Sequence, residues 1–192
     1  YADGWDDGDN GGTGFGPWSL SFNGDASQLN AIYNSDPHFI DGVGVGPLVS
    51  NQLGDPAFGL TATTQQSNQT GAVATEAMRD FLMPLVVGQS FQVDIDGSAL
   101  EGSSGIGNLF ELVGADGVPR YTLRTALGTN GDNWIANGSN TSIPAGDALR
   151  LRLTLTGPDS YSGSVSSLTA NIANFALNAP LAGPPGAAIA SL

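Results

Sequence analysis

Residues 149–156, LRLRLTLT, alternate apolar and polar side chains without interruption. Leucine occupies every second position, and the residues between the leucines are arginine or threonine. Because successive side chains of a β-strand point to opposite faces of a sheet, this period of two predicts a strand with one buried face. Residues 90–96, SFQVDID, show the same period, with Phe91, Val93 and Ile95 on one face. The two segments predict antiparallel sheet structure that is covered on one side.

Glycine content and turn signals favour the same fold class. The chain of 192 residues contains 28 glycines, roughly twice the share found in an average soluble protein. Since glycine destabilises helix interiors, this content favours strands joined by tight turns. One hairpin turn is predicted at Asp116-Gly117, between the segments NLFELVG and RYTLRTAL. We therefore predict an all-β chain, folded as an antiparallel β-sandwich or jelly roll with extended N- and C-terminal segments.

Residues 75–83, TEAMRDFLM, are the segment that this pattern does not explain. They are good helix formers followed by Pro84, so local propensity predicts a short helix with Ala77 and Phe81 on one face. A strand would instead place Ala77, Arg79 and Phe81 on one face, with the arginine turned inward. Propensity is a weak prior that tertiary contacts override, so the residues alone leave both interpretations open.

The charge balance limits the kinds of partner. The chain has 18 acidic residues, five arginines, no lysine and a formal net charge of −13. Such a charge repels phosphate backbones and anionic membrane surfaces, so we expect no nucleic-acid binding. No apolar run approaches the roughly 20 residues that span a bilayer, so we expect no membrane insertion. The absence of cysteine excludes disulfides, thiolate metal sites and cysteine catalysis.

The acidic opening of the chain has two interpretations. The stretch DGWDDGDNGGTGFGPW (residues 3–18) contains aspartates among glycines and no basic residue. It lacks the spacing of an EF-hand, but Asp3, Asp7 and Asp9 with backbone carbonyls could hold a hard cation, and oxygen ligands favour calcium. The alternative is a solvated, turn-rich lead-in. We expect no required cofactor, and calcium is the one ion that this stretch suits.

No combination of residues in the sequence indicates an enzyme. His38 is the only histidine, and no G-x-S-x-G motif accompanies it. Two acidic pairs could serve acid–base chemistry, namely Asp94 with Asp96 and Glu101 with Glu111. Alternating aspartates on a strand are more often its solvated face. We therefore predict that the chain has no catalytic site.

Three tryptophans and three sequons are further candidate sites. Trp5, Trp18 and Trp134 could stack on sugars at the surface of a sandwich, or could pack within the fold. Three N-x-S/T patterns could accept glycans in polar loops, although such short patterns also arise by chance. The three sequon asparagines are Asn68, Asn137 and Asn140.

Five motifs along the chain are DNGGTGFGPW (9–18), FGLTA (58–62), AMRDF (77–81), VGQSFQVDIDG (87–97) and LTLTGPDSYS (153–162). Together they resemble a group of secreted bacterial β-sandwich proteins, many of which carry a sorting segment of the PEP-CTERM type. The resemblance covers roughly residues 9–165. It implies a concanavalin-like or carbohydrate-binding jelly roll, an extracellular location and a strand at 75–82, and it brings no catalytic residue with it. A start at Tyr1 rather than methionine agrees with a processed, secreted form, and the C-terminal residues lack a hydrophobic anchor.

The C-terminal residues suggest how copies of the chain could associate. We expect one sandwich domain over residues 1–178, which includes the acidic lead-in, and an extended Pro/Ala/Gly-rich tail over 179–192. Natural edge strands are often protected by lysine side chains, and this chain contains no lysine. An apolar tail could therefore complete a neighbour's sheet through Leu181, Ile189 and Leu192. The sequence therefore predicts an extracellular structural protein that self-assembles into filaments or a surface layer. The alternative is a carbohydrate-binding module that binds extracellular polysaccharide.

Overall fold

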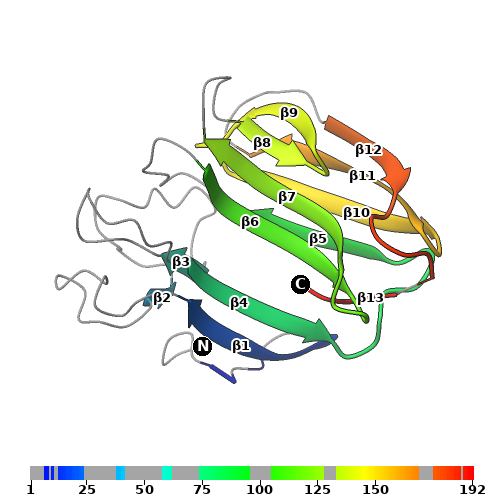
Figure 1. The fold of residues 1–192 in the computed structure, drawn as a ribbon, viewed down its shortest axis with the longest axis horizontal. Helices are drawn as coiled ribbons and strands as arrows, with labels where there is room; N and C mark the ends of the chain where they lie inside the picture. Colours follow the sequence, from blue (N-terminus) through cyan, green and yellow to red (C-terminus); the bar gives the residue numbers. More distant parts are fainter. Residues whose placement is uncertain are drawn as a thin grey trace. The chain divides into compact units, whose positions relative to one another are not determined.

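The computed structural model describes residues 7–8, 10, 13–23, 38–41, 58–61, 74–95, 105–127, 133–168, 175–186 and 188–192. All regular elements within these ranges are β-strands, so the predicted all-β class is confirmed (Figure 1). The chain divides into two compact units, of which unit 1 contains Tyr1–Val45 and Asp55–Leu82, and unit 2 contains Gly46–Gly54 and Met83–Leu192. This division differs from the predicted one, because the C-terminal residues belong to unit 2 instead of forming a separate tail.

Unit 1 contains two antiparallel strand pairs. Strand β1 (Phe15–Asn23) pairs with β4 (Ala74–Phe81), and β2 (His38–Asp41) pairs with β3 (Phe58–Thr61). Strand β4 contains most of the helix-forming segment, so pairing with β1 overrides its local propensity. The structure thus agrees with the strand that the resemblance implies.

Arg79 points inward from β4, as a strand at this position requires. Its side chain is buried, and Nε donates to the carbonyl of Gly16 at 2.7 Å. The guanidinium carbon lies 4.8 Å from the centre of the Phe15 ring and 5.0 Å from that of Trp18. Contact with two aromatic faces offsets part of the loss of water around the cation. The charge that seemed to argue against a strand is therefore accommodated inside unit 1.

Unit 2 contains two antiparallel sheets. In the first, β13 (Ile189–Ser191), β6 (Gly105–Gly114), β7 (Pro119–Leu127), β8 (Asn133–Ala136) and β9 (Ser139–Pro144) pair in that order. In the second, the order is β12 (Phe175–Pro180), β11 (Ser160–Ser167), β10 (Leu149–Gly157) and β5 (Ser90–Ile95). The predicted hairpin joins β6 to β7, with Gly117 at a φ of 75°.

The sheets of unit 2 pack face to face as a β-sandwich, shown in Figure 1. Phe91 of β5 stacks on Phe110 of β6 with ring centres 5.8 Å apart, and Tyr121 of β7 meets Tyr161 of β11 edge to face at 5.5 Å. The four leucines of β10 are all buried, as their alternation predicts. Burial of these alternating apolar faces stabilises the sandwich. The finer jelly-roll topology stays a prediction.

Candidate functional site

The last twelve residues of the chain form a distinct structural feature of unit 2. We call residues 181–192 the C-terminal arm. From the end of β12 the arm turns through Gly183 and Gly186, whose φ angles are 81° and 83°, and then supplies β13 to the edge of β6. Positive φ values of this size favour glycine, and Pro184 and Pro185 between the two glycines restrict the backbone further. The local sequence therefore specifies the course that the arm takes.

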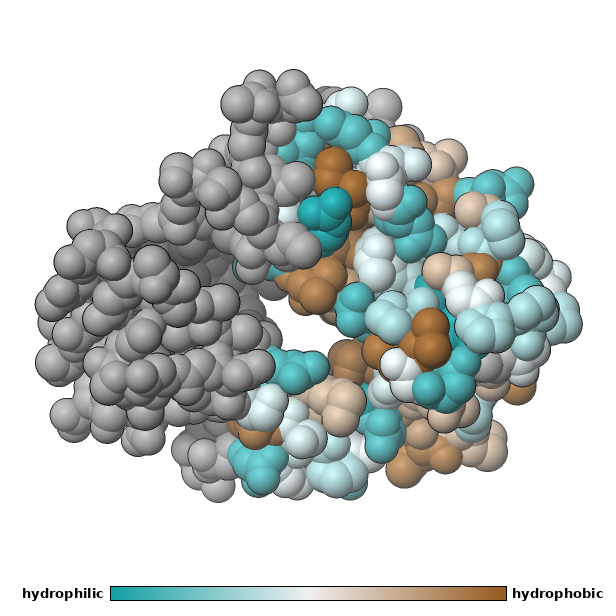
Figure 2. All heavy atoms as spheres, in the orientation of Figure 1, coloured by the Kyte–Doolittle hydropathy of each residue, from teal (hydrophilic) through white to brown (hydrophobic). Residues whose placement is uncertain are grey.

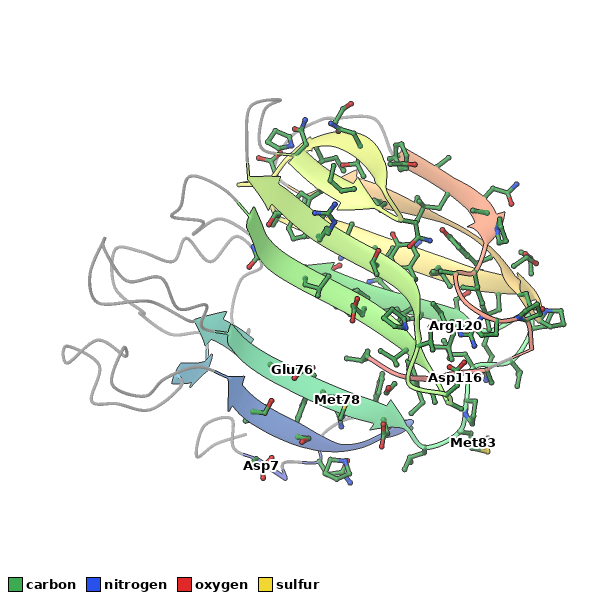
Figure 3. All side chains as sticks on the ribbon, in the orientation of Figure 1. Asp7, Glu76, Met78, Met83, Asp116 and Arg120 are labelled. Atoms are coloured by element: carbon green, nitrogen blue, oxygen red, sulfur yellow. The ribbon has the colours of Figure 1, made fainter. Side chains whose placement is uncertain are left out.

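Arg120 of β7 holds the first half of the arm. Only 1% of this residue is exposed. Its Nη1 donates to the carbonyls of Ala182 (2.9 Å) and Pro184, and its Nη2 donates to Asp116 Oδ2 at 2.9 Å. The backbone adds a bond from the Ala182 amide to the Arg120 carbonyl at 3.0 Å. Figure 3 shows Arg120 and Asp116 together beside the arm, so a buried cation is paired with a carboxylate and with backbone carbonyls.

Two glycines leave the space that Arg120 occupies. A Cβ on Gly114 would lie 2.6 Å from Arg120 Nε, and a Cβ on Gly183 would lie 2.8 Å from its Nη1. Neither distance is compatible with a real side chain, so the guanidinium fills the gap between β6 and the arm. Asp159 contributes on the other side, because its carboxylate accepts from the Gly186 amide and its carbonyl accepts from the Leu181 amide at 2.8 Å.

The second half of the arm lies between two segments of unit 2. Ile189 and Ser191 of β13 pair with β6, and the Ile189 side chain is completely buried. The Ala115 amide donates to the Ala188 carbonyl at 2.9 Å, and the Leu85 amide donates to the Ile189 carbonyl at 3.0 Å. The arm is therefore hydrogen-bonded on both of its sides, and Ile189 is its one large side chain that is completely buried.

An apolar pocket of about 220 Å³ lies beside the docked arm. It is lined by Leu85–Val87, by Leu155 and the turn that follows β10, and by arm residues that include Leu181 and Ile189. None of the lining side chains is an acid, a base or a nucleophile. The pocket therefore suits an apolar group and offers no group for chemical catalysis.

The predicted assembly residues are buried within their own chain. Leu181 is 8% exposed, Ile189 is fully buried, and Leu192 is half-buried. In the single chain, the predicted extended tail over 179–192 docks on unit 2 of the same chain. The reason is that Arg120 and the edge of β6 supply partners that the tail's own composition does not reveal.

The predicted calcium site lies largely outside the described residues. Asp3 and Asp9 fall there, whereas Asp7 is exposed and its Oδ1 accepts from the Leu20 amide at 2.9 Å. This bond gives Asp7 a structural role in a turn against β1. Among the described residues, no group of three or more His, Asp or Glu side chains could hold a metal ion. Calcium binding by the opening stretch stays a prediction.

The tryptophans do not form a sugar platform in the described part of the chain. Trp134 is fully buried, and its indole nitrogen donates to the Asp147 carbonyl at 3.1 Å, so of its two interpretations the structure supports packing within the fold. Trp18 is half-buried, and its ring faces the Arg79 guanidinium. Trp5 lies outside the described residues. An aromatic residue in a Gly/Asn-rich context proved to be a core residue, because it lies on strand β8 with its side chain buried.

The sequons differ from one another in how accessible they are. The Asn137 side chain accepts from the Thr122 amide at 2.8 Å, and its Nδ2 donates to Tyr161 Oη at 2.7 Å. A glycan on Nδ2 would break the bond to Tyr161, so the structure argues against Asn137 as an acceptor. Asn140 is exposed, and the bond that its side chain makes uses Oδ1, which accepts from the Ser142 amide at 2.7 Å. Asn68 lies outside the described residues.

One of the candidate acids is part of an ion pair. Arg150 donates to both carboxylate oxygens of Asp94, each at 2.7 Å. This hydrogen bonding lowers the pKa of Asp94 below its usual value, so the carboxylate stays ionised. A general acid needs the opposite shift. Asp96 and Glu101 lie outside the described residues.

Sequence reasoning missed Arg120 and its two glycines. Nothing in the string GVPRYTL distinguishes this arginine from a solvated one, because its two partners in the arm are backbone carbonyls more than 60 residues away. The one available signal was the scarcity of basic residues, which makes each of the five arginines worth examining.

Within the ranges given above, the structure holds no helix of the length and apolarity that a membrane crossing requires.

The comparisons with other proteins give no family for this chain. Searches with protein-family models, among curated proteins and among solved structures found no match. The resemblance to secreted bacterial sandwich proteins therefore stays a prediction, and the function must be argued from the arm and its surroundings.

Proposed function

We propose that the chain is an extracellular structural subunit that assembles with copies of itself by exchanging the C-terminal arm. The observation that carries the proposal is that β13 pairs with β6 at the end of a proline- and glycine-containing connection. In the exchanged form, the arm of one copy makes the same contacts with β6 and Arg120 of the next copy.

Exchange costs little energy because it replaces each contact with an identical one. The hydrogen bonds and the burial of Ile189 are the same whether the arm comes from the same chain or from a neighbour, so only the hinge after Pro180 differs. The prolines restrict the free arm, which reduces the conformational entropy lost when it docks. The arm also has no charged side chain, so it can approach a neighbour of net charge −13 with little repulsion from its own side chains.

The geometry of exchange predicts the kind of assembly. If each copy gives its arm to the next copy, the contact joins two different surfaces and repeats in one direction. Such a contact produces an open filament unless the rotation closes a ring. The alternative of sugar binding loses one of its three aromatic candidates with the burial of Trp134.

A single charge in the arm tests the proposal in the full-length protein. Ile189→Asp places a carboxylate in a fully buried position, whereas Ala190→Asp, the matched control, adds the same charge to the neighbouring, half-buried residue. We expect concentrated wild-type protein and Ala190→Asp to form oligomers, and Ile189→Asp to remain monomeric. Size-exclusion chromatography with light scattering gives the mass, and negative-stain microscopy gives the shape.

A synthetic peptide of residues 181–192 provides a second measurement. It should compete with the arms of neighbouring copies and shorten the assemblies, whereas the same peptide with Ile189→Asp should have no effect. Wild-type protein that stays monomeric at high concentration, or assembly that is equal in Ile189→Asp, would contradict the proposal.

A further inference from the structure

An uncharged apolar surface lies directly beside the docked arm. Met83, Val86 and Val87 are 76%, 58% and 54% exposed, although they are large hydrophobic residues within five positions of one another. Figure 3 labels Met83 on the outside of the molecule, and Figure 2 shows hydrophobic atoms at the surface in that region. Single exposed apolar residues are common, but a cluster next to an apolar pocket marks an interaction site.

The charge distribution limits what can cover this surface. Residues 83–89, 153–158 and 181–192, which surround the pocket, contain no charged side chain. In a chain of net charge −13, this is a surface at which two copies approach with the least repulsion and bury apolar area on both sides. The Asp159 carboxylate borders the pocket, but it accepts a hydrogen bond from the Gly186 amide of the arm.

The surface is also continuous with the arm. Val86, Val87 and Ile189 line the same pocket, so an arm supplied by a neighbour would lie directly against Val86 and Val87. We infer that Met83, Val86, Val87 and the pocket form a second contact between copies of this chain, made beside the exchanged arm. This inference rests on the proposed function, because it takes arm exchange to be what brings the two surfaces together.

The size of the surface explains why it needs the arm. Stable protein interfaces bury roughly 1,200–2,000 Å² in total, and three side chains with a small pocket supply only a fraction of that area. The contact is therefore weak by itself, and it adds affinity to an encounter that the arm has already made local.

Substitutions that keep the arm intact test the inference in the full-length chain. Met83→Asn and Val87→Asn each remove an exposed apolar group, and Leu168→Asn is the matched control at an exposed leucine after β11. We expect the first two to raise the protein concentration for half-assembly by about tenfold, and the control to leave it unchanged. Sedimentation velocity measures this concentration.

Amide exchange shows whether the arm remains docked in the same variants. The Ala115 amide is bonded to the arm, so its protection in the monomer reports docking. Unchanged assembly with Ala115 still protected would overturn the second contact and leave the proposed function standing. A wild type that never assembles would remove both. The dye anilinonaphthalene sulfonate gives a third readout, because its binding should fall on assembly, and equal binding to monomer and oligomer would show that the pocket stays open to a small ligand and overturn the inference.

Discussion

The core of the sandwich and the C-terminal arm are both antiparallel and both contain fully buried side chains, but they are held together differently. In the core, strands such as β7 and β10 contribute several buried residues each and have a partner strand on both sides. The arm has Ile189 as its one large, fully buried side chain, and it relies on a few hydrogen bonds and on Arg120. Both regions therefore contain a fully buried side chain, but far fewer interactions hold the arm in place than hold a core strand.

This difference matters because cooperativity depends on how many contacts must break together. Opening the arm exposes the edge of β6 and one isoleucine, whereas opening β10 disrupts two strand pairings and a row of leucines. Proteins open locally with free energies that range from near zero up to the global value. The arm should lie toward the low end of this range and the core at the high end.

The largest expected effect is in the core. Trp134→Ala removes a fully buried indole and its bond to the Asp147 carbonyl, and we expect it to lower the free energy of unfolding by about 3–5 kcal/mol. Urea denaturation followed by circular dichroism measures this change. Trp134→Phe should lose less, because most of the volume is kept. A loss below about 1 kcal/mol would show that Trp134 lies in a region that relaxes freely.

A smaller, local effect is expected in the arm. Ile189→Ala removes most of a fully buried side chain and should weaken arm docking by about 2–4 kcal/mol. The loss stays below the largest values for such substitutions because the neighbouring side chains can relax into the adjoining pocket. Native-state hydrogen exchange should then be faster by at least about 30-fold at the Leu85 and Ala115 amides, which bond to the arm, and unchanged in β10. Equal acceleration in β10 would mean that the arm and the core open as one unit.

The smallest effect concerns Tyr161, whose hydroxyl accepts a hydrogen bond from Asn137 and whose ring meets Tyr121 edge to face. Tyr161→Phe leaves the Asn137 Nδ2 group without its partner, and we expect a loss of about 1–2 kcal/mol at neutral pH. Burial raises the pKa of both phenols. The pKa of each phenol in the folded state lies above its unfolded value of about 10. The two buried phenols therefore make their full contribution to the free energy of unfolding below about pH 10, and this contribution is lost as the pH rises toward the folded-state pKa.

Two measurements follow from this sign. The free energy of unfolding of the wild type should decrease between pH 10 and pH 11, and the decrease should be shallower in Tyr161→Phe. Phenolate absorbance should show that the two core tyrosines do not ionise at pH 10 in the folded protein. Ionisation of all tyrosines at pH 10 without loss of structure would contradict the buried contact.

The local sequence was sufficient for the elements whose pattern repeats over several residues. The alternation in residues 149–155 identified β10 and its buried face, and Asp116-Gly117 located the β6–β7 hairpin. These predictions succeed because the period of a strand and the φ of a turn glycine depend on neighbouring residues alone. The strand at β4 needed more, since its propensity is helical and pairing with β1 decides the outcome.

Other features depended on contacts between residues far apart in the chain. The sequence left open whether Trp134 stacks on a sugar or packs within the fold, and the structure buries it. Asn137 was a candidate glycan acceptor, but in the structure its Nδ2 donates to the Tyr161 hydroxyl. The arm illustrates the limit best. Its prolines, glycines and lack of charge are visible in the sequence, and they determine that it is stiff and able to dock. Where it docks was decided by Arg120 and the edge of β6, because a buried arginine and an open strand edge are recognised only once the chain has folded.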